Sequence, residues 1–208
     1  MGSHQHETTA DRWLPAGTVR VEHDGAVQLH YALSNEGDVA LPYLWSSHPL
    51  LPLTPDTRLE LPIASRVRVW AQHGIDLGGE LAEHRWPMLR VQGREVDFTR
   101  PGMVPGAWAC KLFLDLPQPE ARPLRIAVEQ DRRRLVFELD THDVPTLGLW
   151  LNHGGWTPFE DAAPYVNFAF EPCIGAPDPL DAALGAWRSA QWLGARETRR
   201  WGMTIRAG

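Results

Sequence analysis

Apolar and polar residues alternate along most of the chain, which is the pattern of β-strands with one buried face. The clearest case is residues 147–152, where three leucines alternate with Gly148, Trp150 and Asn152. Similar alternation, or a short apolar run, predicts further strands at residues 18–21, 27–33, 39–45, 66–70, 109–114, 123–128, 134–139, 166–170 and 197–205. This pattern predicts an all-β, antiparallel protein.

Turn residues divide the chain into short segments. Its 18 Pro and 18 Gly interrupt it at roughly ten-residue intervals, a spacing that favours a β-sandwich or barrel over a helical bundle. Asp24-Gly25 is a hairpin turn signal. Residues 71–106 are rich in Gly and Pro and predict long loops or short strands. Only residues 178–190 have a helical composition, with Pro179 near the expected start.

Composition limits the possible classes. A chain of 208 residues is long enough for one domain, residues 1–208, of which residues 1–16 are polar and tag-like or disordered. The net charge of −6 argues against a nucleic-acid partner. No apolar run reaches membrane-span length and no signal peptide is visible, so we expect no membrane partner and a cytoplasmic location. Cys110 and Cys173 are expected to be free thiols.

Glu171 is the first candidate for chemistry. It follows the apolar run 166–170 and precedes Pro172, which is expected to end the strand because proline cannot donate to a ladder. A carboxylate held at the end of an apolar strand can act as a general base in a partly dry site. The alternative is a glutamate in solvent or in an ordinary salt bridge.

His48 is the second candidate. Its side chain gains and loses a proton near neutral pH, and Pro49 fixes the backbone directly after it. The alternative is a hydrogen-bonded structural histidine at a strand end.

Other chemistries have weaker signals. Nine His and two Cys form no recognisable metal motif, so no metal is predicted. No G-x-S-x-G nucleophile motif or phosphate-binding glycine loop is present. Glycoside hydrolysis by two carboxylates is the main chemical rival, with Glu171 paired with Glu160, Asp161 or Asp178. Spacing along the sequence does not test that pairing.

Several stretches together resemble the aldose 1-epimerase (galactose mutarotase-like) superfamily. They are YALSNEGD at 31–38, LWSSHPLL at 44–51, LGLWLNHGGW at 147–156 and FAFEPCIGAPD at 168–178. The resemblance implies a galactose mutarotase-like β-sandwich (supersandwich). It also implies that Glu171 takes the proton of the anomeric hydroxyl while His48 gives one to the ring oxygen, from opposite sides of the sugar.

The resemblance extends to further residues and to ligands. It implies a small-molecule sugar as partner, with Asn152, Trp150 and Trp156 as sugar contacts, Lys111 as a weaker one, and no cofactor. His6 resembles a second histidine of the family's cleft, although Glu7 stands where the family has glycine.

The chain also departs from the family. It lacks the family's N-terminal strands, so it is either a fragment or a domain whose open sheet edge is covered, for example in a homodimer. Two alternatives to an aldose 1-epimerase-like enzyme therefore stay open: a non-catalytic carbohydrate-binding β-sandwich, and a structural or dimerising fragment.

Overall fold

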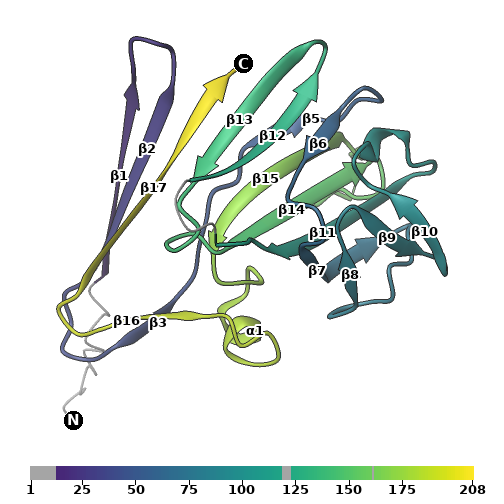
Figure 1. The fold of residues 1–208 in the computed structure, drawn as a ribbon. Helices are drawn as coiled ribbons and strands as arrows, with labels where there is room; N and C mark the ends of the chain where they lie inside the picture. The colour runs from purple at the N-terminus through teal and green to yellow at the C-terminus, as the bar shows by residue number, and fades with distance from the viewer. Residues whose placement is uncertain (1–12, 119–122, 161) are drawn as a thin grey trace.

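A computed structural model describes residues 13–118, 123–160 and 162–208 (Figure 1). Its regular structure is almost entirely antiparallel β-sheet, as the sequence predicted. The strands are β1 (Trp13–Val21), β2 (Val27–Asn35), β3 (Leu41–Tyr43), β4 (Trp45–Ser46), β5 (Leu50–Pro52), β6 (Arg58–Glu60), β7 (Arg66–His73), β8 (Glu83–Arg85), β9 (Met88–Val91), β10 (Arg94–Asp97), β11 (Trp108–Asp115), β12 (Leu124–Gln130), β13 (Arg133–Leu139), β14 (Thr146–His153), β15 (Val166–Ile174), β16 (Gln191–Leu193) and β17 (Thr198–Ala207). A 3₁₀ turn covers Pro101–Met103, and α1 spans Leu180–Leu184.

Two large sheets make up the sandwich. The six-stranded sheet has the order β1-β2-β17-β13-β12-β6, and the nine-stranded sheet has the order β10-β9-β8-β7-β11-β14-β15-β4, with β5 also paired to β15. β16 and β3 form a small third sheet. In Figure 1 the β1-β2-β17 end of the six-stranded sheet extends away from the nine-stranded sheet. This is the antiparallel β-sandwich expected from the sequence.

The hydrophobic core lies between the two large sheets. The three leucines of β14 and the two phenylalanines of β15 face it, together with side chains from β12, β13 and β17 of the other sheet. Phe137 and Phe170 meet edge to face across the sandwich, with ring centroids 5.5 Å apart. Because side chains alternate along a strand, the residues between these core positions lie on the opposite, outer face of the nine-stranded sheet.

The outer face is partly covered by the segment 175–190, which follows β15 and contains α1. Gly175 starts this segment at a φ of 82°, and a Cβ there would lie 2.4 Å from Leu44 Cδ2 and 2.9 Å from the Ser189 carbonyl oxygen. Glycine is therefore required for the chain to turn away from β15 at this point. Trp187 is buried against Phe113 and Cys173 of the sheet and fastens the segment to it.

One sequence prediction about β15 is wrong. The strand does not end at Glu171; it continues through Pro172 to Ile174. The carbonyl oxygen of Pro172 accepts a hydrogen bond from Ser47 N, so the proline nitrogen faces the same side, in the gap between β4 and β5. No backbone N–H is needed there to donate a hydrogen bond to a neighbouring strand, so β15 tolerates the proline.

Other segments follow the predictions with adjusted bounds. Residues 13–16, which we expected to precede the first strand, are part of β1, and the predicted strand 39–45 is divided into β3 and β4. Residues 71–106 contain the short strands β8 to β10, and the helix is a single short one. In the described part of the chain no helix is long and apolar enough to span a membrane. Cys110 and Cys173 are buried free thiols, as expected.

Candidate active site

Glu171 lies on the outer face of the nine-stranded sheet, directly opposite Gly148 of β14. Its side chain is fully buried. A Cβ at Gly148 would lie 3.1 Å from Glu171 Cβ, so the missing side chain at this position leaves the room that the glutamate occupies. The pairing of β14 with β15 therefore fixes both the place and the direction of the carboxylate.

Three charged or titratable groups converge on Glu171. His48 Nε2 lies 3.1 Å from Oε1, and Lys111 Nζ donates a hydrogen bond to Oε2. Asp178 Oδ2 is 3.5 Å from the same ammonium group. The four residues come from the β4–β5 connection, β11, β15 and the segment after β15, so the fold brings together groups that are far apart in the sequence.

Burial dominates the electrostatics of this cluster. Removal from water raises the pKa of Glu171 above its ordinary value, because desolvation disfavours the charged carboxylate. Lys111 and, to a smaller extent, His48 oppose this rise in pKa, whereas Asp178 adds to it. Oε1 has no properly aligned hydrogen-bond donor among the described residues, despite its short distance to His48. Oε1 is therefore the oxygen that is available to accept a proton.

His48 is held over Glu171 by the two short strands on either side of it. β4 pairs with the end of β15 at Cys173, and β5 pairs with its middle at Ala169. The imidazole is 53% exposed, while Glu171 is not exposed at all. The sequence predicted donor and acceptor on opposite sides of a sugar ring, but in the structure they are in direct contact. In this arrangement Glu171 has no surface open to a ligand.

Aromatic side chains border Lys111 on the same face. Trp150 lies opposite Lys111 in the β11–β14 ladder, and its Nε1 donates to Asn167 Oδ1 at 3.1 Å. Trp156 meets Trp150 edge to face at a centroid distance of 5.4 Å, and the His73 ring lies 6.4 Å from that of Trp156. Both tryptophans are half-buried, so parts of their rings are open to a ligand. Sequence reasoning missed His73, which only the pairing of β7 with β11 brings here.

Asn152, predicted as a sugar contact, is fully buried and supports the loop after β14 instead. Its Oδ1 accepts hydrogen bonds from the amides of Gly155 (3.1 Å) and Trp156 (3.3 Å), and its Nδ2 donates to the Trp156 carbonyl oxygen at 2.8 Å. In this conformation it holds Trp156 in place. His6, also predicted as a contact, lies outside the described residues.

The carboxylates of the glycoside-hydrolysis alternative are separated. Glu160 is exposed, Asp161 lies outside the described residues, and only Asp178 reaches the Glu171 cluster, through Lys111. Glu171 and Asp178 share the ammonium group of Lys111, whereas that reaction needs two carboxyl groups that flank the scissile bond. The described residues contain no group of three or more His, Cys, Asp or Glu that could hold a metal ion.

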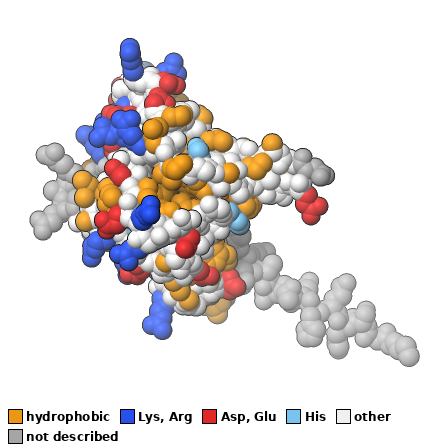
Figure 2. Space-filling model, turned by 90° about the vertical axis from the view of Figure 1, so that its right-hand side faces the viewer, with side chains coloured by type: hydrophobic (Ala, Val, Ile, Leu, Met, Phe, Trp, Pro, Cys, Tyr) orange, Lys and Arg blue, Asp and Glu red, His pale blue; other side chains and the backbone are white. Residues whose placement is uncertain are grey.

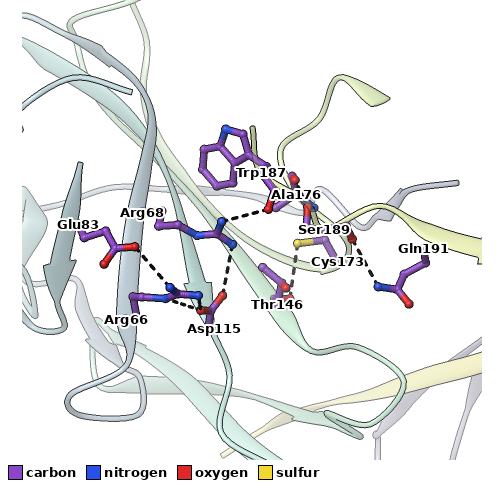
Figure 3. A network of polar contacts seen from close by, with 10 residues as sticks. All are labelled: Arg66, Arg68, Glu83, Asp115, Thr146, Cys173, Ala176, Trp187, Ser189 and Gln191. Carbon is purple, nitrogen blue, oxygen red and sulfur yellow. Dashed lines mark hydrogen bonds and ion pairs between the residues drawn. The ribbon is translucent and has the colours of Figure 1, made fainter. Parts of the chain in front are cut away.

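A polar network attaches the covering segment to β7 and β11 (Figure 3). Arg66 and Arg68 lie 2.5 and 3.5 Å from the Asp115 carboxylate, and the Arg68 guanidinium stacks 4.5 Å from the centre of a Trp187 ring. The sequence predicted residues 66–70 only as a strand. The network helps to fix the segment that carries Asp178.

The surface seen from the right-hand side of Figure 1 has an apolar centre with charged side chains mainly around it (Figure 2).

Comparison with solved structures gives several matches along nearly the whole chain. A candidate aldose 1-epimerase from Klebsiella pneumoniae aligns with 97% of this chain at a TM-score of 0.65 and 14% identity. A candidate aldose 1-epimerase from Escherichia coli K12 aligns with 99% of this chain at a TM-score of 0.63 and 18% identity. A galactose mutarotase related enzyme from Lactobacillus acidophilus aligns with 95% of this chain at a TM-score of 0.58 and 12% identity.

These matches are much longer proteins. The alignments span 48%, 63% and 62% of their respective lengths. No protein-family model and no curated protein matches the sequence. At sequence identities this low, the alignments establish a shared fold and nothing more. The chain has the fold of the galactose mutarotase-like β-sandwich proteins.

Proposed function

We propose that this protein interconverts the anomers of an aldose, a hexose or a related sugar, by acid–base catalysis. The observation that carries the proposal is the pair formed by buried Glu171 and half-exposed His48, with Oε1 and Nε2 3.1 Å apart. The aromatic side chains of Trp150 and Trp156 on the same face support a sugar as the ligand. The descriptions of the similar structures, which name aldose 1-epimerase and galactose mutarotase, support the same substrate class.

The proposed reaction consists of proton transfers. The Glu171 carboxylate takes the proton of the anomeric hydroxyl, and protonated His48 gives a proton to the ring oxygen as the C1–O5 bond breaks. The free aldehyde rotates about C1–C2, and closure with reversed proton transfers gives the other anomer. A raised pKa makes Glu171 a stronger base than a glutamate in solvent. The chemistry requires no cofactor.

Substrate entry requires His48 to turn away from Glu171. Its side chain is half-exposed and lies in a connection of three residues between β4 and β5, so rotation of the ring displaces little else. Hydrogen bonds in a ligand-free site often rearrange when substrate binds. In the proposed complex the sugar lies between Oε1 and the displaced imidazole.

Anomer exchange provides the test. Freshly dissolved α-glucose and α-galactose are followed by ¹H NMR with wild-type protein and with Glu171→Gln. Glu160→Gln, at an exposed position, is the matched control. Loss of a general base lowers the rate by about 10²-fold or more, so only Glu171→Gln is expected to lose acceleration. Wild-type rates equal to those in buffer, for these and other aldoses, would refute catalysis.

Sugar binding without catalysis is the second candidate. Both oxygens of Glu171 already have a charged or titratable neighbour, and the side chain has no exposed surface, as in a structural salt bridge. Titration of tryptophan fluorescence with sugars separates the two candidates. Saturable quenching without anomer exchange would favour a binding domain, and no response at millimolar sugar would favour a structural role.

We further propose that a second copy of this chain covers the open edge of the six-stranded sheet. Among the described residues β1 pairs only with β2, and residues 15–21 are exposed along the strand, including Val19 and Val21. Unprotected edges of this length favour pairing with another strand. β1 has one charged residue in its exposed part, Arg20, so an antiparallel pairing centred near its middle brings no like charges together.

Sedimentation equilibrium tests this dimer. Wild-type protein is expected at twice the 23.4 kDa chain mass, and Val19→Lys, which places a charge on the edge, is expected to be monomeric. A wild-type monomer at 100 µM protein concentration, roughly the upper range of such assays, would exclude the pairing.

We place the protein in the cytoplasm. The support is that Cys110 and Cys173 are unpaired thiols, which persist in reducing compartments. Fractionation of the native cells would check this location.

A further inference from the structure

Lys111 is the only lysine of the chain; all other permanently basic side chains are arginines. It lies in the middle of β11, between β7 and β14, and is 4% exposed. Lysine is almost never buried to this extent without a charged partner. Its position therefore depends on the two carboxylates that it contacts.

The ammonium group of Lys111 joins Glu171 to Asp178. It donates to Glu171 Oε2, lies 3.5 Å from Asp178 Oδ2, and lies 5.3 Å from the centre of the Phe113 ring. Because Lys111 donates its hydrogen bond to Oε2, Oε1 is the oxygen that faces His48. Asp178 shares the ammonium group with Glu171 and stands at the start of the segment that covers the sheet.

We propose that Lys111 and Asp178 are positioning residues of this site. Lys111 orients the Glu171 carboxylate and favours its ionised form. Asp178 weakens the attraction between Lys111 and Glu171, so that Glu171 remains basic enough to accept a proton. This proposal deepens the proposed function and rests on it for its kinetic readout. Neither residue touches the sugar. Both act through the carboxylate of Glu171.

The two residues have opposite effects on the charge of Glu171. Burial favours the protonated form of a carboxyl group, and a protonated Glu171 cannot act as a base. Lys111 lowers the pKa of Glu171 and restores the carboxylate, whereas Asp178 raises it again. The groups that face Glu171 are Lys111 from β11, His48 from the β4–β5 connection, Asp178 from the covering segment, and the Cys173 thiol two residues along its own strand.

Titration of Glu171 tests the proposal without relying on activity. The protein is labelled with ¹³C at the glutamate carboxyl carbon, and the Glu171 signal is assigned by its absence in Glu171→Gln. Lys111→Met is expected to raise the pH at the midpoint of the Glu171 titration by about one to three units, the usual effect of losing an opposite charge nearby. Asp178→Asn is expected to lower the same midpoint. Glu160→Gln, remote from the cluster, is the control that leaves it unchanged.

The pH–rate profile of anomer exchange adds the kinetic readout. The acidic limb of kcat/KM is expected to follow the NMR midpoint: upward for Lys111→Met, with rates recovering at higher pH, and downward for Asp178→Asn. Lys111→Arg keeps the positive charge, so it is expected to restore ionisation but not the full rate, because the larger guanidinium displaces the carboxylate.

A merely structural salt bridge would behave differently. It would lower stability and shift the Glu171 midpoint in Lys111→Met but leave the pH–rate profile unshifted, and that result would overturn the proposal. A shift in the same direction for both variants would overturn it as well. If Lys111→Met does not fold, Asp178→Asn still tests the predicted direction of the shift in the Glu171 midpoint. Asp178 is 54% exposed, so its replacement is expected to leave the fold intact. If wild-type protein exchanges no anomers, the proposed function fails while the NMR midpoints still test the positioning.

Discussion

Gly148→Ala is the substitution that most directly tests how Glu171 is positioned. Gly148 faces Glu171 across the β14–β15 ladder, and its φ does not lie in the left-handed region, so alanine can adopt its backbone conformation. The added Cβ would lie 3.1 Å from Glu171 Cβ, 3.2 Å from Phe113 Cε1 and 3.3 Å from the Glu171 carbonyl oxygen. These groups must move for the methyl group to fit.

The size of the effect follows from these contacts. Carbon atoms in good contact are about 3.5–4.0 Å apart, so Glu171 must shift by roughly 0.4 Å or more. A misplacement of about 1 Å costs on the order of 100-fold in rate, and a shift of this size therefore predicts about a sixfold loss in kcat/KM. Overpacking costs about 1 kcal/mol, but alanine recovers about 0.4–1 kcal/mol through the unfolded state. The free energy of unfolding should change little.

NMR measurement of anomer exchange and urea denaturation, both on the same preparations, check this prediction. Gly17→Ala is the control, because its added Cβ would meet Tyr31 Cδ1 at an ordinary 3.6 Å. The reasoning is refuted if Gly148→Ala keeps the full rate, or if Gly17→Ala loses as much. A large loss of stability without a loss of rate would also contradict it.

Two further predictions concern the core. Leu149→Ala should lower the free energy of unfolding by about 2–5 kcal/mol, because Leu149 is fully buried between the sheets. Val166 is 46% exposed, so Val166→Ala should change the free energy of unfolding by about 0.5 kcal/mol or less. Equal unfolding midpoints in urea for the two variants would contradict the assignment of the core face. Burial raises the pKa of the Cys173 thiol to about 12 and raises that of Cys110 further, so both thiols should react with a disulfide reagent at pH 8 only after denaturation. Stoichiometric labelling of native protein would exclude this burial.

The sequence by itself determined the sheet structure and the two faces of its central strands. In residues 147–152 the alternation of leucines with Gly148, Trp150 and Asn152 was enough to separate the core from the outer face, because burial acts on each strand locally through a period of two. The same local patterns predicted most strands, the short helix and the free thiols. Residue context made Glu171 and His48 candidates, and their pairing as base and acid came from the resemblance of short stretches to a known superfamily.

Only the tertiary structure decided how the candidate residues meet. Strand order is a property of the whole sheet, and the pairing of β11 with β14 placed Lys111 beside Glu171. Pro172 could not end β15, because the gap between β4 and β5 needs no donor from it. Direct contact of His48 with Glu171, and contact of Asp178 with the lysine that Glu171 also contacts, depend on chain segments that are far apart in the sequence. No local pattern contains that information, since side-chain contacts between distant segments are fixed only when the sheets assemble.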